Sequence, residues 1–281
     1  MVVHLTDDVG EFATIAEPFL RSEPFTANVI AVEVDGVMSG QRSLHPGSRW
    51  ILIEERGQLV GVAMHTPPFN LFLPKLGVGV PEAVAGALWS GGHRFPGVSG
   101  EAVTVQRFVG AWGALGGAGS CVRVRTRMYV LGTLRPPEGM AGHGRQAVGA
   151  DADLLIGWLH AFFAETDNVS HDADIDGVAG RRLADGQFWL WEDGGEPVSV
   201  AGVHPPAAGV ARVGPVYTPG QRRGRGYGSA VAALASGAGM DRGAAHVVLY
   251  TDLSNPTSNA IYQAIGYMPD HDAEERDLLA G

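Results

Sequence analysis

The stretch that decides the fold runs from Val213 to Tyr267. It begins VGPVYTPGQRRGRGYGSAVAAL and ends YTDLSNPTSNAIYQAIGY. Its first residues, Val213 to Thr218, form a short apolar strand pattern that a Pro-Gly break ends. A loop rich in arginine and glycine follows, then an alanine-rich helix, a second strand (His246 to Thr251) and a short helix. The N–H groups at a helix N-terminus have no partner within the helix, and glycine lets a ligand approach them closely. This order therefore predicts an anion-binding site.

The glycine spacing excludes two common phosphate-binding motifs. A Walker A loop needs Lys and then Ser or Thr after its last glycine, whereas Gly226 is followed by Tyr and Gly. A dinucleotide-binding loop needs G-x-G-x-x-G in the first unit of a parallel sheet, and the run Gly224 to Gly228 is spaced differently. The pattern [RQ]-x-x-G-x-[GA] does fit, in the frames Gln221 to Gly226 and Arg223 to Gly228.

This pattern resembles the acetyl-CoA site of the GNAT (Gcn5-related N-acetyltransferase) family. In that family the strand before the loop ends in a V-x-T-P-like sequence, which here reads Val216-Tyr217-Thr218-Pro219 and selects the frame from Arg223. The family's next element, N-x-x-[AS]-x-x-x-Y-x-x-x-G-[FY], is matched by Asn255, Ser258, Tyr262, Gly266 and Tyr267. The glycine loop alone is a weak signal, but the two elements in this order form a specific one. The resemblance covers residues 145–281 directly.

Length and composition indicate a globular protein with a sizeable core. The 281 residues, of which 45% are hydrophobic, suit one large or two ordinary domains. The net charge of −10 argues against non-specific nucleic-acid binding, which needs clustered cations. It mildly favours a cationic substrate such as an amine, although solubility explains the same charge. We found neither a signal-peptide pattern nor a long apolar run, and so expect a cytoplasmic protein that does not engage a membrane.

Cysteine and histidine usage gives no sign of a disulfide or a metal. Cys121 is the sole cysteine, so an intramolecular disulfide and a Cys-based zinc site are excluded. Its alternating neighbours predict a buried thiol in a strand. The ten histidines show no H-x-x-x-H or comparable ligand pair, and we expect no metal.

Before the deciding stretch, the pattern of apolar residues predicts an ordered series of elements. The opening strand should be followed by a helix that Asp8 caps and that turns Phe12, Ile15 and Leu20 to one side. The remaining predictions are a helix from Pro24 to Val37, a hairpin of Trp50–Glu54 and Leu59–Met64, helices at Pro81–Trp89 and Ser99–Trp112, and a strand from Cys121 to Leu134. The proline- and glycine-rich run Arg135 to Gly144 predicts a domain boundary.

The chain then repeats itself. A short strand from Arg145 and an Asp-capped amphipathic helix match its opening, and RWILIEERGQLVGVAMHTPP (Arg49 to Pro68) aligns without gaps to QFWLWEDGGEPVSVAGVHPP (Gln187 to Pro206). Eight of the 20 aligned residues are identical, which indicates two copies of one fold. The first copy has Gly77-Val78-Gly79 followed by Pro81 where the second has its loop, and it has no counterpart of the Asn/Tyr element.

The repeat and the resemblance together predict an α/β (α+β) protein of two tandem GNAT-like domains. Each would have a mixed, mostly antiparallel sheet flanked by helices. We place a degenerate domain without a cofactor motif at residues 1–137, a linker at 138–144 and an acetyl-CoA-binding domain at 145–281. The first domain would then serve packing or substrate shaping.

The resemblance implies roles for individual residues. The loop N–H groups and arginines, Arg222 among them, would hold the CoA pyrophosphate on the helix dipole, and the strand would pair with the pantetheine arm. The cofactor-binding residues implied are Val216, Tyr217, Thr218, Arg223, Gly224, Arg225, Gly226, Tyr227, Gly228, Ser229 and Asn255. The catalytic residue implied is Tyr262, as the general acid that protonates the leaving thiolate. Simpler readings stay open: a core aromatic for Tyr262, a helix cap for Asn255 and a solvated loop for the arginines.

The sequence does not identify the general base or the acceptor. Glu192 and His204 are the candidates for the base, and each also suits a structural role. The acceptor site is expected near Asp167 to Gly186. The activity implied is transfer of the acetyl group of acetyl-CoA to a primary amine of a small molecule or peptide. A non-catalytic acyl-CoA-binding or regulatory module is the alternative, and the Asn/Tyr element disfavours an unrelated phosphate binder. Monomer and homodimer both stay open.

Overall fold

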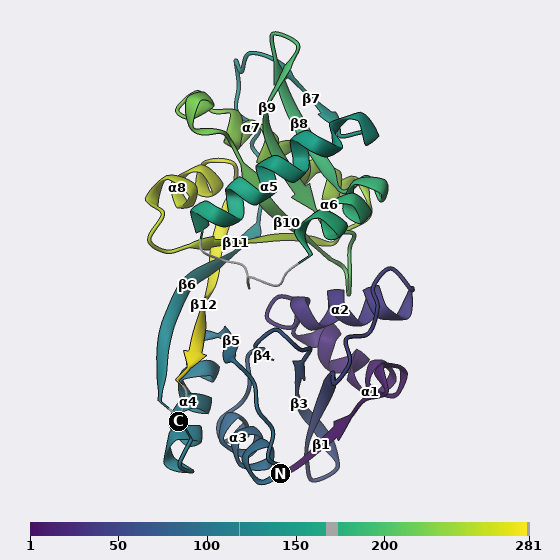
Figure 1. Ribbon diagram of the computed structural model, residues 1–281, viewed down its shortest axis with the longest axis vertical. Coiled ribbons are helices and arrows are strands. Elements are labelled where there is room, and N and C mark those ends of the chain that lie inside the picture. The colour runs from purple at the N-terminus through teal and green to yellow at the C-terminus, as the bar shows by residue number, and fades with distance from the viewer. Residues whose placement is uncertain (118, 167–173, 280–281) are drawn as a thin grey trace. The chain divides into compact units, whose positions relative to one another are not determined.

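The computed structural model describes residues 1–117, 119–166 and 174–279 (Figure 1). The chain folds into two compact units. The first consists of Met1–Arg127, Asp252–Ser254 and the last residues from His271 on, and the second of Met128–Thr251 and Asn255–Asp270. Each unit has hydrophobic clusters of its own, so each can be described by itself.

The first unit has a mixed sheet in the order β1-β2-β3-β4-β5-β12. Its β4 and β5 are parallel, and its other neighbouring strands are antiparallel. Its elements are β1 (Val2–Thr6), α1 (Val9–Ser22), α2 (Asn28–Met38), β2 (Arg49–Glu55), β3 (Gln58–His65), β4 (Leu71–Leu73), α3 (Val80–Ser90), β5 (Gly97–Glu101) and α4 (Ala102–Ala114), and it shares β6 (Ser120–Leu131) and β12 (Tyr267–Leu278) with the second unit. Asp8 caps α1 as predicted.

The second unit repeats this plan with strand order β6-β11-β10-β9-β8-β7. Strands β7 to β10 are antiparallel to their neighbours, and β10 and β11 are parallel. Its elements are β7 (His143–Gln146), the 3₁₀ turn Gly149–Asp151, α5 (Ala152–Thr166), α6 (Ile175–Ala184), β8 (Phe188–Asp193), β9 (Glu196–Val203), β10 (Val210–Tyr217), the 3₁₀ turn Gly220–Arg222, α7 (Tyr227–Asp241), β11 (His246–Asp252) and α8 (Pro256–Ala264). The predicted mixed α/β architecture is therefore confirmed.

The internal repeat is visible in the pairing register of the two hairpins. The β2–β3 ladder shifts register between Ile53 and Glu54, and the β8–β9 ladder shifts between Trp191 and Glu192, at the aligned positions of the repeat. The turns Arg56-Gly57 and Gly194-Gly195 both have positive φ at both residues. Such two-residue turns match the twist of a hairpin. The same sequence pattern thus gives the same local geometry twice.

The last strands of the units do not follow the predicted boundaries 1–137 and 145–281. From Ala273 to Asp277, β12 pairs with β5 of the first unit, whereas β6 belongs to the second unit from Met128 onward. The predicted linker 138–144 also ends inside β7. The charges of β12 concealed it in the sequence, because it lacks an apolar face. Its Asp272 and Glu274 form ion pairs with Arg127 and Arg125 of β6, at 2.6 and 3.0 Å.

Two local predictions were wrong. The helix expected from Ser99 begins only at Ala102, because residues 97–101 form β5. Gly100 has φ +138°, and a Cβ there would lie 1.8 Å from the carbonyl oxygen of Leu73, so this close strand approach requires glycine. Cys121 is exposed rather than buried. It lies in the first half of β6, which becomes fully buried only at Met128 and Tyr129.

The helices of the second unit cover both faces of its sheet. Helix α7 packs its Val231 and Ala235 in one cluster with Tyr262, and Leu155 and Leu159 of α5 pack with Tyr217 in another. Figure 1 shows α5 and α6 in front of the strands of this unit. A site that opens between the strands is therefore reached from two chemically different sides.

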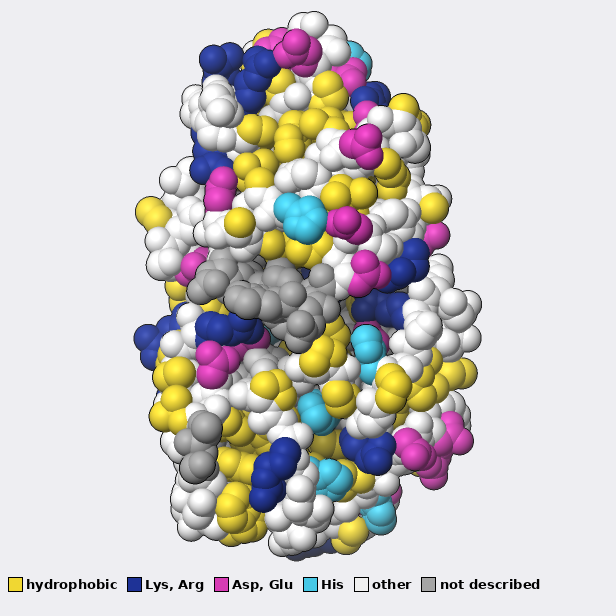
Figure 2. Space-filling view, viewed as in Figure 1, with side chains coloured by type: hydrophobic (Ala, Val, Ile, Leu, Met, Phe, Trp, Pro, Cys, Tyr) yellow, Lys and Arg dark blue, Asp and Glu magenta, His cyan; other side chains and the backbone are white. Residues whose placement is uncertain are grey.

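The molecular surface is mixed in charge. On the face drawn in Figure 2, Lys and Arg side chains lie interspersed with Asp and Glu over both units. Across the described residues, every helix is too short or too polar to cross a membrane.

Candidate active site

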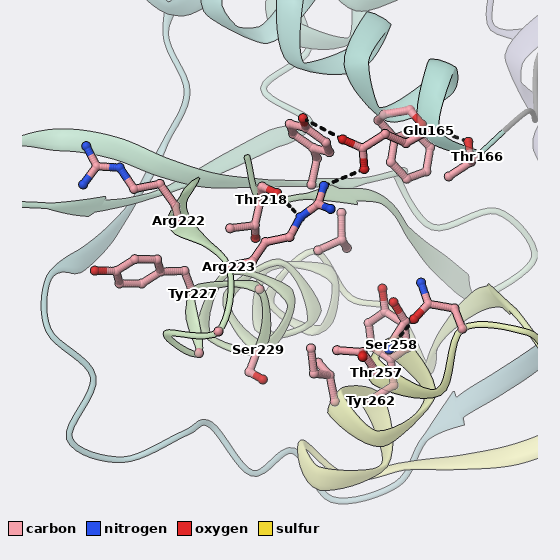
Figure 3. Close-up of a pocket in the computed structure, with 18 residues that line it drawn as sticks. Glu165, Thr166, Thr218, Arg222, Arg223, Tyr227, Ser229, Thr257, Ser258 and Tyr262 are labelled. Carbon is pink, nitrogen blue, oxygen red and sulfur yellow. Dashed lines mark hydrogen bonds and ion pairs between the residues drawn. The ribbon is translucent and has the colours of Figure 1, made fainter. Parts of the chain in front are cut away.

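A cavity of about 510 Å³ in the second unit gathers the predicted site residues (Figure 3). It is formed where β10 ends, α7 begins and α8 crosses below, with the C-terminal end of α5 on the other side. Every residue predicted for the site lines it except Arg225. The lining residues are Phe162, Glu165, Thr166, Val216, Tyr217, Thr218, Arg222, Arg223, Gly224, Gly226, Tyr227, Gly228, Ser229, Asn255, Thr257, Ser258, Ile261 and Tyr262.

Strand β10 has an open edge beside this cavity. On one side it pairs with β9 up to Tyr217, with a register shift between Val213 and Val216. On the other side its parallel pairing with β11, among the described residues, ends at Arg212 and Val248. The predicted splay of the two strands is therefore present. An extended amide-containing ligand that enters there can add itself to the sheet as a strand does.

The N-terminus of α7 supplies N–H groups to the same cavity. Gly226 is its N-cap residue with φ +82°, and within the described chain no side chain caps the first turn. The N–H groups of Tyr227, Gly228 and Ser229 precede the first intrahelical bond, which Ala230 donates to Gly226. Unsatisfied donors together with the helix dipole favour an anion at this point.

The phenol of Tyr262 forms part of the opposite wall. Tyr262 is only 8% exposed, and burial raises its pKa to about 12. Its hydroxyl has no hydrogen-bond partner among the described residues, whereas that of the neighbouring Tyr267 bonds Ser236 at 2.7 Å. The Tyr262 phenol therefore remains protonated at neutral pH and can donate its proton to a bound group.

Arg223 connects the loop to α5. Its Nη2 lies 2.5 Å from a carboxylate oxygen of Glu165, and its Nε donates to the carbonyl of Thr218 at 2.8 Å. The Tyr217 hydroxyl donates to the other Glu165 oxygen at 3.3 Å. Burial, and then the Glu165 charge, raise the pKa of Tyr217. Figure 3 shows Arg223 directed toward Glu165 and Arg222 directed away from it. Arg222 instead pairs with Glu196 at 2.6 Å.

Other predicted residues divide between site and scaffold. Asn255 lines the cavity and also caps α8, since its side chain accepts from the N–H of Ser258 at 3.0 Å. Ser199, on β9, fixes the end of β10 by bonding the Tyr217 carbonyl and the Thr218 hydroxyl at 2.9 and 2.7 Å. Arg225 is exposed and points to no described partner. Roles in binding and catalysis stay predictions for all these residues.

Neither candidate for the general base lines the cavity. Glu192 accepts a hydrogen bond from Arg145 at 2.7 Å and joins a pair that Arg145 also makes with Asp151. Its role in this region is structural. The backbone N–H of His204 bonds Arg212 at the far end of β10 from the loop. The carboxylate that does line the cavity is Glu165, which no motif singled out because it lies at the end of an ordinary amphipathic helix.

The expected acceptor region, 167–186, is described only in part. Residues 167–173 lie outside the described residues, and from Asp174, which caps α6, the chain is helical up to Ala184. Among the described residues, no group of three or more His, Cys, Asp or Glu side chains is placed to hold a metal ion.

A splayed strand pair, an uncapped helix N-terminus and a protonated tyrosine define a site for an extended cofactor with an anionic end. Comparison with known proteins identifies its class. Residues 153–267 match the model of the acetyltransferase (GNAT) family. Through this domain the chain belongs to the GNAT family of acetyltransferases. A comparison with curated protein sequences gave no match.

Solved structures share the fold along the whole chain. An acetyltransferase from the GNAT family of Colwellia psychrerythraea covers 99% of this chain and 100% of its own at a TM-score of 0.65 and 11% identity. A Gcn5-related N-acetyltransferase of Sphaerobacter thermophilus covers 98% and 95% at 0.62 and 14%. A tandem GNAT protein from the clavulanic acid biosynthesis pathway covers 98% and 97% at 0.55 and 13%. The tandem fold is thus shared, and at these identities the likeness concerns the fold alone.

Proposed function

We propose that this protein transfers the acetyl group of acetyl-CoA to a primary amine of a small molecule or peptide by direct attack. The observation that carries the proposal is one cavity that joins the N-terminus of α7, the open edge of β10 and the hydroxyl of Tyr262. The pyrophosphate would bind the first at Gly224 to Ser229, the pantetheine arm would pair with the second, and the thioester sulfur would reach the third.

The chemistry required is simple. The neutral amine attacks the thioester carbonyl, the tetrahedral intermediate collapses, and the C–S bond breaks. Tyr262 gives its proton to the departing thiolate, and the nitrogen releases a proton to solvent. Positioning contributes most when both reactants are held in one cavity, and general acid catalysis adds about 10²- to 10⁴-fold.

The first unit supports a single cofactor site per chain. Its β4 is paired with β5 along all three residues, from Leu71 with Val98 to Leu73 with Gly100, so the strands do not splay. The backbone N–H of Leu76, just beyond β4, donates to the Thr104 hydroxyl at 3.1 Å. We therefore propose that this copy is degenerate and binds no CoA.

Calorimetry with acetyl-CoA on the wild type and on Gly226→Asp tests the proposal. A side chain at Gly226 would lie 2.8 Å from the sulfur of Met140, and aspartate would add a negative charge where the pyrophosphate binds. We expect micromolar binding, about −8 kcal/mol, with one site per chain in the wild type and no binding in the variant. Thiol release with a panel of primary amines then separates an enzyme from a non-catalytic acyl-CoA-binding module, which binds without turnover. A wild type that binds no acetyl-CoA refutes both.

A further inference from the structure

Glu165 is the one acidic residue among the described residues that line the cavity. It is the penultimate residue of α5, and its carboxylate bridges Arg223 of the cofactor loop and Tyr217 of β10. About half of its side chain is exposed, as is that of Arg223. This carboxylate is therefore both within the site and open to exchange its partner.

The two faces of the sheet separate Glu165 from the general acid. Tyr262 packs with α7 on one face, and Tyr217, which bonds Glu165, packs with α5 on the other. The attacking nitrogen and the leaving sulfur occupy different positions around the reacting carbon, so each needs its own approach. With the sulfur on the side of Tyr262, the side of Glu165 is left for the amine.

Arg223 occupies this carboxylate in the ligand-free protein. The same arginine begins the glycine loop, and its guanidinium is shared between Glu165 and the Thr218 carbonyl. A pyrophosphate at the α7 N-terminus carries more charge than one carboxylate and offers paired oxygens, which guanidinium groups bind strongly. It would compete for Arg223 and leave Glu165 without its counter-ion.

We propose that Glu165 receives the acceptor as an ammonium ion, and that Arg223 covers this carboxylate until the pyrophosphate of the cofactor draws the guanidinium away. The acceptor half rests on the function proposed above. The favoured acceptors are cationic amines without an anionic group close to the nitrogen, since Glu165 attracts the first and repels the second. The ammonium ion loses a proton to solvent before it attacks.

Coenzyme A binding tests the exchange without any acceptor. In Glu165→Gln the competitor of the pyrophosphate is gone, so coenzyme A should bind more tightly, by up to about fivefold for an exposed ion pair. Pantetheine, which lacks the pyrophosphate, should bind both proteins equally. Coenzyme A affinity that is unchanged or weaker in the variant overturns the exchange. A wild type that binds no coenzyme A instead contradicts the proposed function. A thermal melt checks that Glu165→Gln is folded.

Amine kinetics test the acceptor half, with putrescine and 4-aminobutanoate as probes of equal length. The matched control is Glu196→Gln, which frees the adjacent Arg222 but removes a carboxylate outside the cavity. We expect the wild type to prefer putrescine, Glu165→Gln to lose at least tenfold in kcat/KM for it and to lose the preference, and Glu196→Gln to retain both. A preference that survives in Glu165→Gln overturns the acceptor role. A wild type that binds coenzyme A yet acetylates neither probe also overturns this choice of acceptor.

Discussion

Tyr262→Phe is the substitution that most directly separates catalysis from packing. Both Tyr262 and Tyr267 are buried in the same cluster, with ring centroids 6.1 Å apart. The Tyr262 hydroxyl faces the cavity, whereas that of Tyr267 bonds Ser236 and lies outside it. Phenylalanine removes only the hydroxyl in each case, so Tyr267→Phe is a control of the same size in the same core.

The structure gives opposite expectations for the two variants. Tyr262→Phe should lower kcat by about 10²- to 10⁴-fold through loss of the general acid and leave the affinity for acetyl-CoA within about threefold. Its stability should stay close to that of the wild type, because the hydroxyl has no partner among the described residues. Tyr267→Phe should keep kcat and lose one hydrogen bond, about 1 kcal/mol, which corresponds to a Tm lower by roughly 2–4 °C.

Stopped-flow thiol release, calorimetry and thermal melts measure the three quantities. The raised pKa of Tyr262, about 12, adds a sign: the acid form persists below that pH, so rates should not fall through loss of this proton between pH 7 and 10. Wild-type kcat in Tyr262→Phe, or an equal loss of kcat in Tyr267→Phe, would refute the assignment of the acid.

Three further predictions concern the scaffold and the stoichiometry. Arg145 and then a backbone N–H lower the pKa of Asp151, so its charge stabilises the fold above pH 4 and this is lost as the pH falls through the lowered value; chemical denaturation should show Asp151→Asn destabilised by roughly 2 kcal/mol at pH 7, with the difference shrinking below pH 4. Gly100→Ala should destabilise the first unit by more than about 3 kcal/mol because its Cβ meets Leu73, whereas Gly86→Ala, with open space in α3, should be neutral or stabilising by up to about 1 kcal/mol, as melts of both variants would show. Calorimetry should give one coenzyme A per chain, and two would contradict a degenerate first copy.

Local signals in the sequence predicted much of the cavity. Gly226 requires positive φ and begins a helix, and Val216 to Thr218 end a strand, so their spacing places an anion site without any long-range information. The repeat of hairpins was equally local. Glu165 could not be predicted, because its meeting with Arg223 depends on how α5 crosses β10. The strand β12 could not be predicted either, because its charges are satisfied by Arg125 and other distant residues.

The two copies show which part of the fold carries the cofactor site. Both have a hairpin with the same register shift and a parallel pair after it, so the shared elements cannot be what distinguishes them. They differ in how far the parallel pair is zipped: to Leu73 and Gly100 at the end of β4, but only to Arg212 and Val248 before the bulge in β10. Because an added strand needs an unpaired edge, closing the first gap removes the site for an extended arm whatever residues follow. Glycine at position 100 permits that closure, which makes it a structural marker of the copy that binds no cofactor.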